Sequence, residues 1–147
     1  MGVLTDVVIA DRDEAQMVAD TDGPAVDRDG FTFNGFDRVQ LCTLLSLLKA
    51  SRPDVEFEHY LDRIDVISSS SGEWPTVSVV PPELVIELAA VAEMDEAEFD
   101  ELVEPWAATE EFAGWAASDV QALLRQLGDL AETASLEGKC LMLWQTI

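Results

Sequence analysis

Hydrophobic side chains crowd the stretch from residue 37 to residue 50. Arranged as a helix, this stretch is apolar around most of its circumference, and only Gln40, Thr43 and Ser46 leave a thin polar stripe. Asp37 stands at its start, where an N-cap residue is favoured. A helix that is apolar on nearly every side is buried, so the pattern predicts a central helix over residues 37–50.

Two pairs of acidic residues predict the starts of two further helices. Glu14 follows Asp11 by three residues and Glu98 follows Asp95 in the same way, which is the spacing of a capping box. The pairs predict a short helix after Asp11 and a longer one after Asp95. Pro105 is expected to break or kink the longer helix and to start a new turn at Trp106, because proline lacks the backbone N–H.

Three more segments favour helices. We expect one over residues 54–63, and another beginning at Pro82, since proline is tolerated in a first helical turn. The longest predicted helix begins with Ser118 as its N-cap and ends before Gly138, which suits a helix C-terminus.

Strands are predicted at 3–9 and 76–80, which are rich in β-branched residues, and at 139–147, which is a short apolar run. The expected fold class is therefore α+β. It is a mostly helical single domain, residues 1–147, with five or six helices and a sheet of about three strands. The first and last strands are placed to pair with each other.

Composition then narrows the class of function. The chain has 147 residues, of which 48% are hydrophobic, so a core can form. Its 30 Asp and Glu against 8 Lys and Arg give a formal net charge of −22. Such a field repels phosphate backbones and anionic membranes, so we expect neither nucleic acid nor membrane as a partner.

The N-terminus lacks a basic region followed by a long apolar run, so it does not resemble a signal peptide. No run approaches the ~18 apolar residues of a membrane span. Cys42 and Cys140 each lie in an apolar stretch, where a free cysteine is typically a small core residue. These features favour a soluble cytoplasmic protein of a bacterium or archaeon, with its oligomeric state left open.

Candidate chemistry is sparse. The single histidine, His59, follows Glu56 by three residues, a spacing that di-iron bundles use twice and this chain uses once. The acidic loop 20–30 fails the calcium-loop pattern, because Pro24 and Ala25 stand where an acid and a glycine are required. Nucleophile motifs and the phosphate-binding loop are missing from the sequence. We therefore expect no cofactor, no metal site and no catalytic residue, and favour a non-enzymatic protein.

The densest run of acids lies at residues 93–111, where nine carboxylates occur without a Lys or Arg. Phe99, Leu102, Val103 and Trp106 share one helical face by their spacing. Most of the acids are then predicted to lie on the solvated side of that helix.

The charge favours a protein that binds a basic protein, as inhibitors or immunity proteins do, because complementary fields speed association. One alternative is a small enzyme or metal-dependent accessory domain that uses carboxylates and His59. Another is a housekeeping domain whose acidity is an adaptation to a salty cytoplasm. The predicted partner-binding residues are an exposed loop tryptophan and four acids: Trp74, Glu96, Asp100, Glu101 and Glu104.

Overall fold

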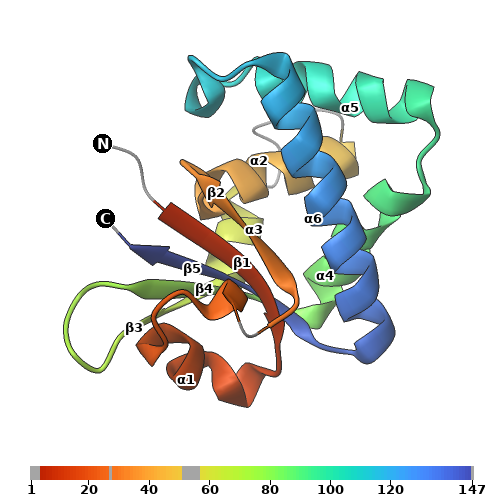
Figure 1. The fold of residues 1–147 in the computed structure, drawn as a ribbon. Coiled ribbons are helices and arrows are strands. Elements are labelled where there is room, and N and C mark those ends of the chain that lie inside the picture. Colours follow the sequence, from red (N-terminus) through yellow and green to blue (C-terminus); the bar gives the residue numbers. More distant parts are fainter. Residues whose placement is uncertain (1–3, 27, 51–56, 147) are drawn as a thin grey trace.

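The computed structural model describes residues 4–26, 28–50 and 57–146, which form six α-helices and a five-stranded antiparallel sheet (Figure 1). The predicted α+β class is confirmed. The strands are β1 (Leu4–Ala10), β2 (Gly30–Asn34), β3 (Asp65–Ser68), β4 (Thr76–Val80) and β5 (Cys140–Thr146). The helices are α1 (Ala15–Asp20), α2 (Arg38–Ala50), α3 (Phe57–Arg63), α4 (Pro82–Ala89), α5 (Glu96–Ala107) and α6 (Ala117–Glu137). Short 3-10 turns add η1 (Arg12–Glu14), η2 (Pro24–Val26), η3 (Ala90–Glu93) and η4 (Glu110–Phe112).

The two terminal strands pair at the centre of the sheet, as predicted. The strand order is β2-β1-β5-β4-β3. β1 and β5 run antiparallel, from Leu4 opposite Thr146 to Ala10 opposite Cys140. Each of them has a second strand on its other side, so both strands are held by two ladders of hydrogen bonds. Residues 3 and 147, which the predicted strands included, lie outside the described residues.

The predicted number of strands was wrong, since the sheet has five among the described residues and not three. The two missed strands, β2 and β3, are the edges of the sheet. β3 has four residues and is largely exposed, and β2 alternates between exposed and half-buried positions. Short edge strands with one solvent-exposed face contain few hydrophobic residues, so their sequence pattern is weak. Their pairing with β1 and β4 places them in the sheet.

Both faces of the sheet are buried, each under its own cluster of apolar side chains. On one face, Val7, Ile9, Leu141 and Leu143 join the large core that α2, α4, α5 and α6 build. On the other face, residues such as Val8, Met142 and Trp144 pack against Ala15, Val18 and Ala19 of α1. Figure 1 shows the larger helices on one side of the sheet and α1 on the other. The central strands therefore carry apolar side chains on both faces, with a few buried polar residues such as Thr5 and Ser78 among them.

Helix α2 is central, as its pattern predicts, and even its polar stripe is buried. Asp37 caps it by accepting hydrogen bonds from the N–H groups of Val39 and Gln40, at 2.9 and 3.2 Å. The Gln40 side chain donates to the main-chain oxygen of Glu111 at 3.1 Å, and Thr43 donates to the oxygen of Val39 at 3.0 Å. These bonds satisfy Gln40 and Thr43, which burial would otherwise leave without partners, whereas the buried Ser46 hydroxyl has no hydrogen-bond partner among the described residues.

Helix α5 continues through Pro105 to Ala107, so the predicted break at that proline was wrong. A proline inside a helix costs ~3 kcal/mol. The next residue, Trp106, is fully buried, and its indole N–H donates to the oxygen of Gln40 at 2.9 Å. Burying ~200 Å² of a tryptophan stabilises by up to ~5 kcal/mol at ~25 cal/mol per Å². Burial of Trp106 therefore outweighs the proline.

The other helix ends mostly follow the sequence signals. Glu98 donates its N–H to the Asp95 carboxylate at 2.8 Å, and Gly138 ends α6 with a φ of 68°. Ser118 was predicted as the N-cap of α6, but the N-cap is Ala116. The residue before it, Trp115, stacks on Phe33 with ring centroids 6.1 Å apart, and this contact positions the chain to turn two residues earlier.

Candidate functional site

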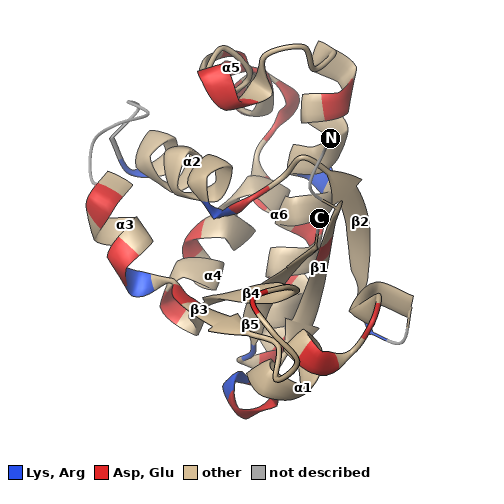
Figure 2. Ribbon diagram, turned by 90° about the vertical axis from the view of Figure 1, so that its left-hand side faces the viewer, with Lys and Arg blue, Asp and Glu red and all other residues tan. Residues whose placement is uncertain are grey.

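The acids of α5 lie on its exposed side, as the helical spacing predicts. Its four apolar residues Phe99, Leu102, Val103 and Trp106 are buried. The side chains of Glu96, Asp100, Glu101 and Glu104 are exposed. The predicted solvated face of this helix is thus confirmed, and the four predicted acids share one helix at one end of the molecule (Figure 2).

These acids are not neutralised by the basic residues of the described chain. The ion pairs formed within the described ranges join Arg12 with Asp65, Arg28 with Glu14, Arg63 with Glu83, and Lys139 with Glu137. None of them involves α5 or η4. Arg125 of α6 lies over the ring of the buried Phe99, 4.2 Å from its centroid. The acidic charge of α5 and η4 therefore faces solvent without an ion-pair partner from the described residues.

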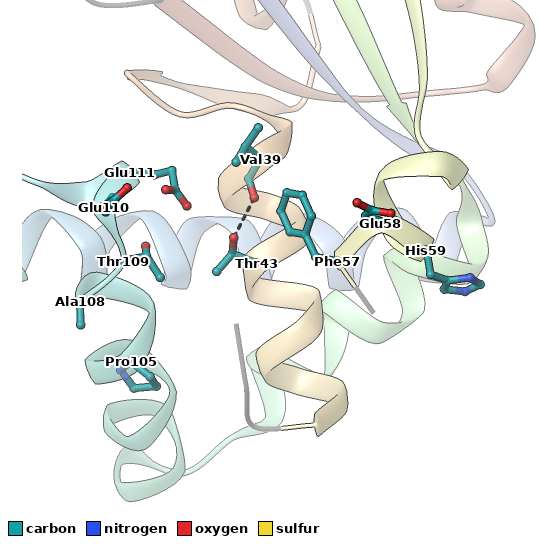
Figure 3. Close-up of a pocket in the computed structure, with 10 residues that line it drawn as sticks. All are labelled: Val39, Thr43, Phe57, Glu58, His59, Pro105, Ala108, Thr109, Glu110 and Glu111. Atoms are coloured by element: carbon teal, nitrogen blue, oxygen red, sulfur yellow. Dashed lines mark hydrogen bonds between the residues drawn. The ribbon is translucent and has the colours of Figure 1, made fainter. Parts of the chain in front are cut away.

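A groove of about 1060 Å³ lies beside this helix, between α2, α3 and the segment from α5 to η4 (Figure 3). Val39 and Thr43 of α2 lie between its two sides. Figure 3 shows the α3 residues on one side of them and the α5–η4 residues on the other. The lining residues are Val39, Thr43, Phe57, Glu58, His59, Pro105, Ala108, Thr109, Glu110 and Glu111.

The groove combines apolar surface with acids. Its apolar surface comes from the side chains of Val39, Phe57, Pro105 and Ala108. The Thr43 hydroxyl already donates a hydrogen bond to the main-chain oxygen of Val39. The three carboxylates, Glu58, Glu110 and Glu111, are exposed. Chemically, the arrangement suits an apolar side chain accompanied by positive charge.

A second hollow of about 300 Å³ adjoins the groove at Pro105, which lines both. It lies along the seam between α2 and α5 and is lined by Leu47, Leu48, Met94, Glu98, Glu101, Leu102 and Pro105. Glu101, one of the predicted partner-binding acids, therefore lies at the edge of a hollow. The hollow and the groove are thus connected through Pro105 of α5.

Trp74 is not part of this region. Its side chain is 42% exposed, and it belongs to the loop 69–75 between β3 and β4. That loop lies at the sheet end of the molecule, whereas α5 lies beyond the helices at the other end (Figures 1 and 2). The structure thus brings the four predicted acids together and leaves the predicted tryptophan apart from them.

The loop that carries Trp74 is held by Asp20 of α1. The Asp20 carboxylate accepts hydrogen bonds from the N–H and hydroxyl of Ser70, at 2.7 and 2.8 Å, and from the hydroxyl of Ser69 at 3.1 Å. These bonds, the Ser70 N–H first, lower the pKa of Asp20. Asp20, which began the failed calcium-loop pattern, therefore serves to fasten a loop to a helix.

Neither the histidine nor the cysteines form an evident catalytic group. His59 is exposed, with its ring edge-on to Tyr60 at 5.5 Å, and Glu56 lies outside the described residues. Burial raises the pKa of the Cys42 thiol to about 12 and also raises that of Cys140, so both stay protonated at neutral pH. Within residues 4–26, 28–50 and 57–146, three or more His, Cys, Asp or Glu side chains nowhere gather closely enough to hold a metal ion.

Most of the groove was not predicted from the sequence. Glu110 and Glu111 fall in the acidic run 93–111, which is the one signal that pointed toward it. Val39 and Phe57 look like ordinary core residues, and Ala108 like an ordinary helix residue. They become groove residues because α2, α3 and α5 diverge there, which is a property of packing.

None of the helices in the described part of the chain is both long and apolar enough to cross a membrane. Comparisons of this chain with protein-family models, with curated proteins and with solved structures found no match.

Proposed function

We propose that this protein binds a basic protein through the acidic surface of α5 and η4. The observation that carries the proposal is the exposed set of acids Glu96, Asp100, Glu101 and Glu104, which find no ion-pair partner among the described residues. A binding role suits this surface, because its carboxylates are exposed and spread along one side of a helix.

Unpaired acids on one helix repel one another. A basic partner would relieve this repulsion on docking. The net charge of −22 also attracts such a partner from a distance and raises the association rate. Screening by salt removes this attraction, because the Debye length is ~8 Å at physiological ionic strength and ~3 Å at 1 M.

The test begins with affinity capture of a basic protein from the native lysate, followed by stopped-flow measurement of its association with the purified protein. We expect an association rate that falls steeply as NaCl rises. Replacing the four α5 acids by amides (E96Q, D100N, E101Q and E104Q together) should weaken binding by roughly tenfold or more, or ~1.4 kcal/mol.

A matched control removes the same number of charges elsewhere. Asp13, Asp22, Asp29 and Glu132 are exposed, lie outside α5, and make no side-chain hydrogen bond with described residues. The variant D13N, D22N, D29N and E132Q should bind within a few-fold of the wild type. Equal weakening by both variants would mean that net charge alone acts. Unchanged binding by the α5 variant would place the docking surface elsewhere.

A further inference from the structure

The groove beside α5 has one side that is fixed before anything binds. The main-chain oxygen of Glu111 accepts a hydrogen bond from the Gln40 side chain at 3.1 Å, and the Thr109 hydroxyl donates to the oxygen of Trp106 at 2.7 Å. Trp106 in turn donates its indole N–H to the oxygen of Gln40 at 2.9 Å. These contacts join the α5–η4 corner to α2. A preformed groove reduces the ordering that a ligand must impose on binding.

The charge of the groove selects what can enter it. Glu58, Glu110 and Glu111 are exposed, and no described Lys or Arg pairs with them. An anionic segment would be repelled. A segment bearing Lys or Arg would instead meet opposite charge on both sides, since Glu58 comes from α3 and the other two acids from η4 (Figure 3).

Charge alone would not hold such a segment firmly. Exposed ion pairs contribute little free energy each, and salt screens them. Affinity in protein interfaces comes mostly from a few apolar or aromatic anchors buried in pockets. The groove offers apolar surface for such an anchor, from Val39, Phe57, Pro105 and Ala108.

We propose that this groove receives an amphipathic basic segment of the protein partner. An apolar side chain of the segment lies against Val39 and Phe57, and its flanking Lys or Arg residues pair with Glu58, Glu110 and Glu111. This inference rests on the proposed function, and it adds the site and the chemistry of the bound segment. The acids of α5 then attract the partner, and the groove holds it.

Three short synthetic peptides, each labelled with fluorescein, test the inference by fluorescence anisotropy. The first alternates Lys with Leu, the second has Ala in place of every Leu, and the third has Glu in place of every Lys. We expect the Lys/Leu peptide to bind roughly tenfold or more tightly than the Lys/Ala peptide, and the Glu/Leu peptide not to bind. Equal binding of the Lys/Leu and Lys/Ala peptides would overturn the anchor.

A substitution in the groove locates the binding. Ala108 is exposed and lines the groove, so Ala108→Trp places a bulky side chain at the groove without changing charge. Ala97 is exposed on α5, the helix that ends just before Ala108, and does not line the groove, so Ala97→Trp is the matched control. Ala108→Trp should weaken the Lys/Leu peptide by roughly tenfold and leave the Lys/Ala peptide unchanged. Equal effects of the two substitutions would refute the location.

Amide NMR shifts of the wild-type protein provide a measurement that does not depend on any variant folding. The Lys/Leu peptide should shift the amide signals of Thr43 and Thr109, and shifts confined to other parts of the chain would overturn the inference. If basic peptides bind equally well with and without Leu, and only the α5 amide variant weakens them, this inference fails and the proposed function stands. If neither basic peptide binds in a salt-dependent way and the lysate yields no basic partner, the proposed function fails as well.

Discussion

The substitution Leu44→Ala measures how much of the fold depends on α2. Leu44 and its neighbour Leu45 are fully buried in the large core. Removing three carbons from a buried leucine loses roughly 2–3 kcal/mol of transfer free energy, at ~0.8 kcal/mol per methylene. The cavity left behind adds to this loss, so the total should be ~2–5 kcal/mol. A typical domain has a free energy of unfolding of ~5–15 kcal/mol, so the change is large.

Urea unfolding followed by tryptophan fluorescence is the suitable assay. Guanidinium is a salt and would screen the net charge of −22 while it denatures the protein, which would mix two effects. Leu136→Ala is the matched control, because Leu136 also lies in a helix, α6, and is 83% exposed. It should change the free energy of unfolding by less than ~0.5 kcal/mol.

Small losses of stability on truncating the core leucines would show that α2 is peripheral. If Leu44→Ala and Leu45→Ala each lower the free energy of unfolding by less than ~1 kcal/mol with an unchanged urea dependence, α2 is not central. A loss at Leu136→Ala as large as at Leu44→Ala would show that burial is not the cause.

Three further predictions concern charge, a loop and an edge strand. The melting temperature should rise as NaCl increases, because salt screens the repulsion among the acids; a falling melting temperature would contradict this. Asp20→Asn should destabilise the fold at neutral pH, whereas Asp22→Asn should not. Because hydrogen bonds lower the folded-state pKa of Asp20 below its ordinary value of 3.8, its contribution is present above that pH and is lost as the pH falls through the folded-state pKa. Urea unfolding of Asp20→Asn and wild type at neutral and acidic pH should show their difference shrinking in acid, and a constant difference would argue against the carboxylate. Gly30→Ala should cost ~1–3 kcal/mol in urea unfolding, because the new Cβ would press on the carbonyl of the neighbouring strand β1. Gly72→Ala, which meets open space, should cost far less, and equal losses would reject the steric reason.

The sequence predicted the structure correctly where the interactions that decide it are local. The apolar circumference of residues 37–50 predicted a buried helix, and the capping pair Asp95 and Glu98 predicted the start of α5. The pattern at 76–80 matched β4 residue for residue. In each case the deciding interaction lies within one helical turn or one strand, or it is the burial of apolar side chains that the segment itself carries.

Long-range packing decided the positions where local rules failed. Pro105 does not end α5, because Trp106 is buried against α2. Ser118 does not cap α6, because Trp115 is held by Phe33, a residue far away in the sequence. The edge strands β2 and β3 exist because β1 and β4 offer them partners.

The candidate site divides in the same way. The sequence by itself determined the amount and sign of the charge, and it placed Glu96, Asp100, Glu101 and Glu104 on the wet side of one helix, because helical period alone separates them from Phe99 and Leu102. Only the tertiary structure decided that Trp74 lies apart from them and that a groove opens beside them at Val39 and Ala108. A groove is the space that remains where packed elements diverge, and that space depends on how α2, α3 and α5 meet. The hydrophobic periodicity of a single segment therefore cannot predict the groove.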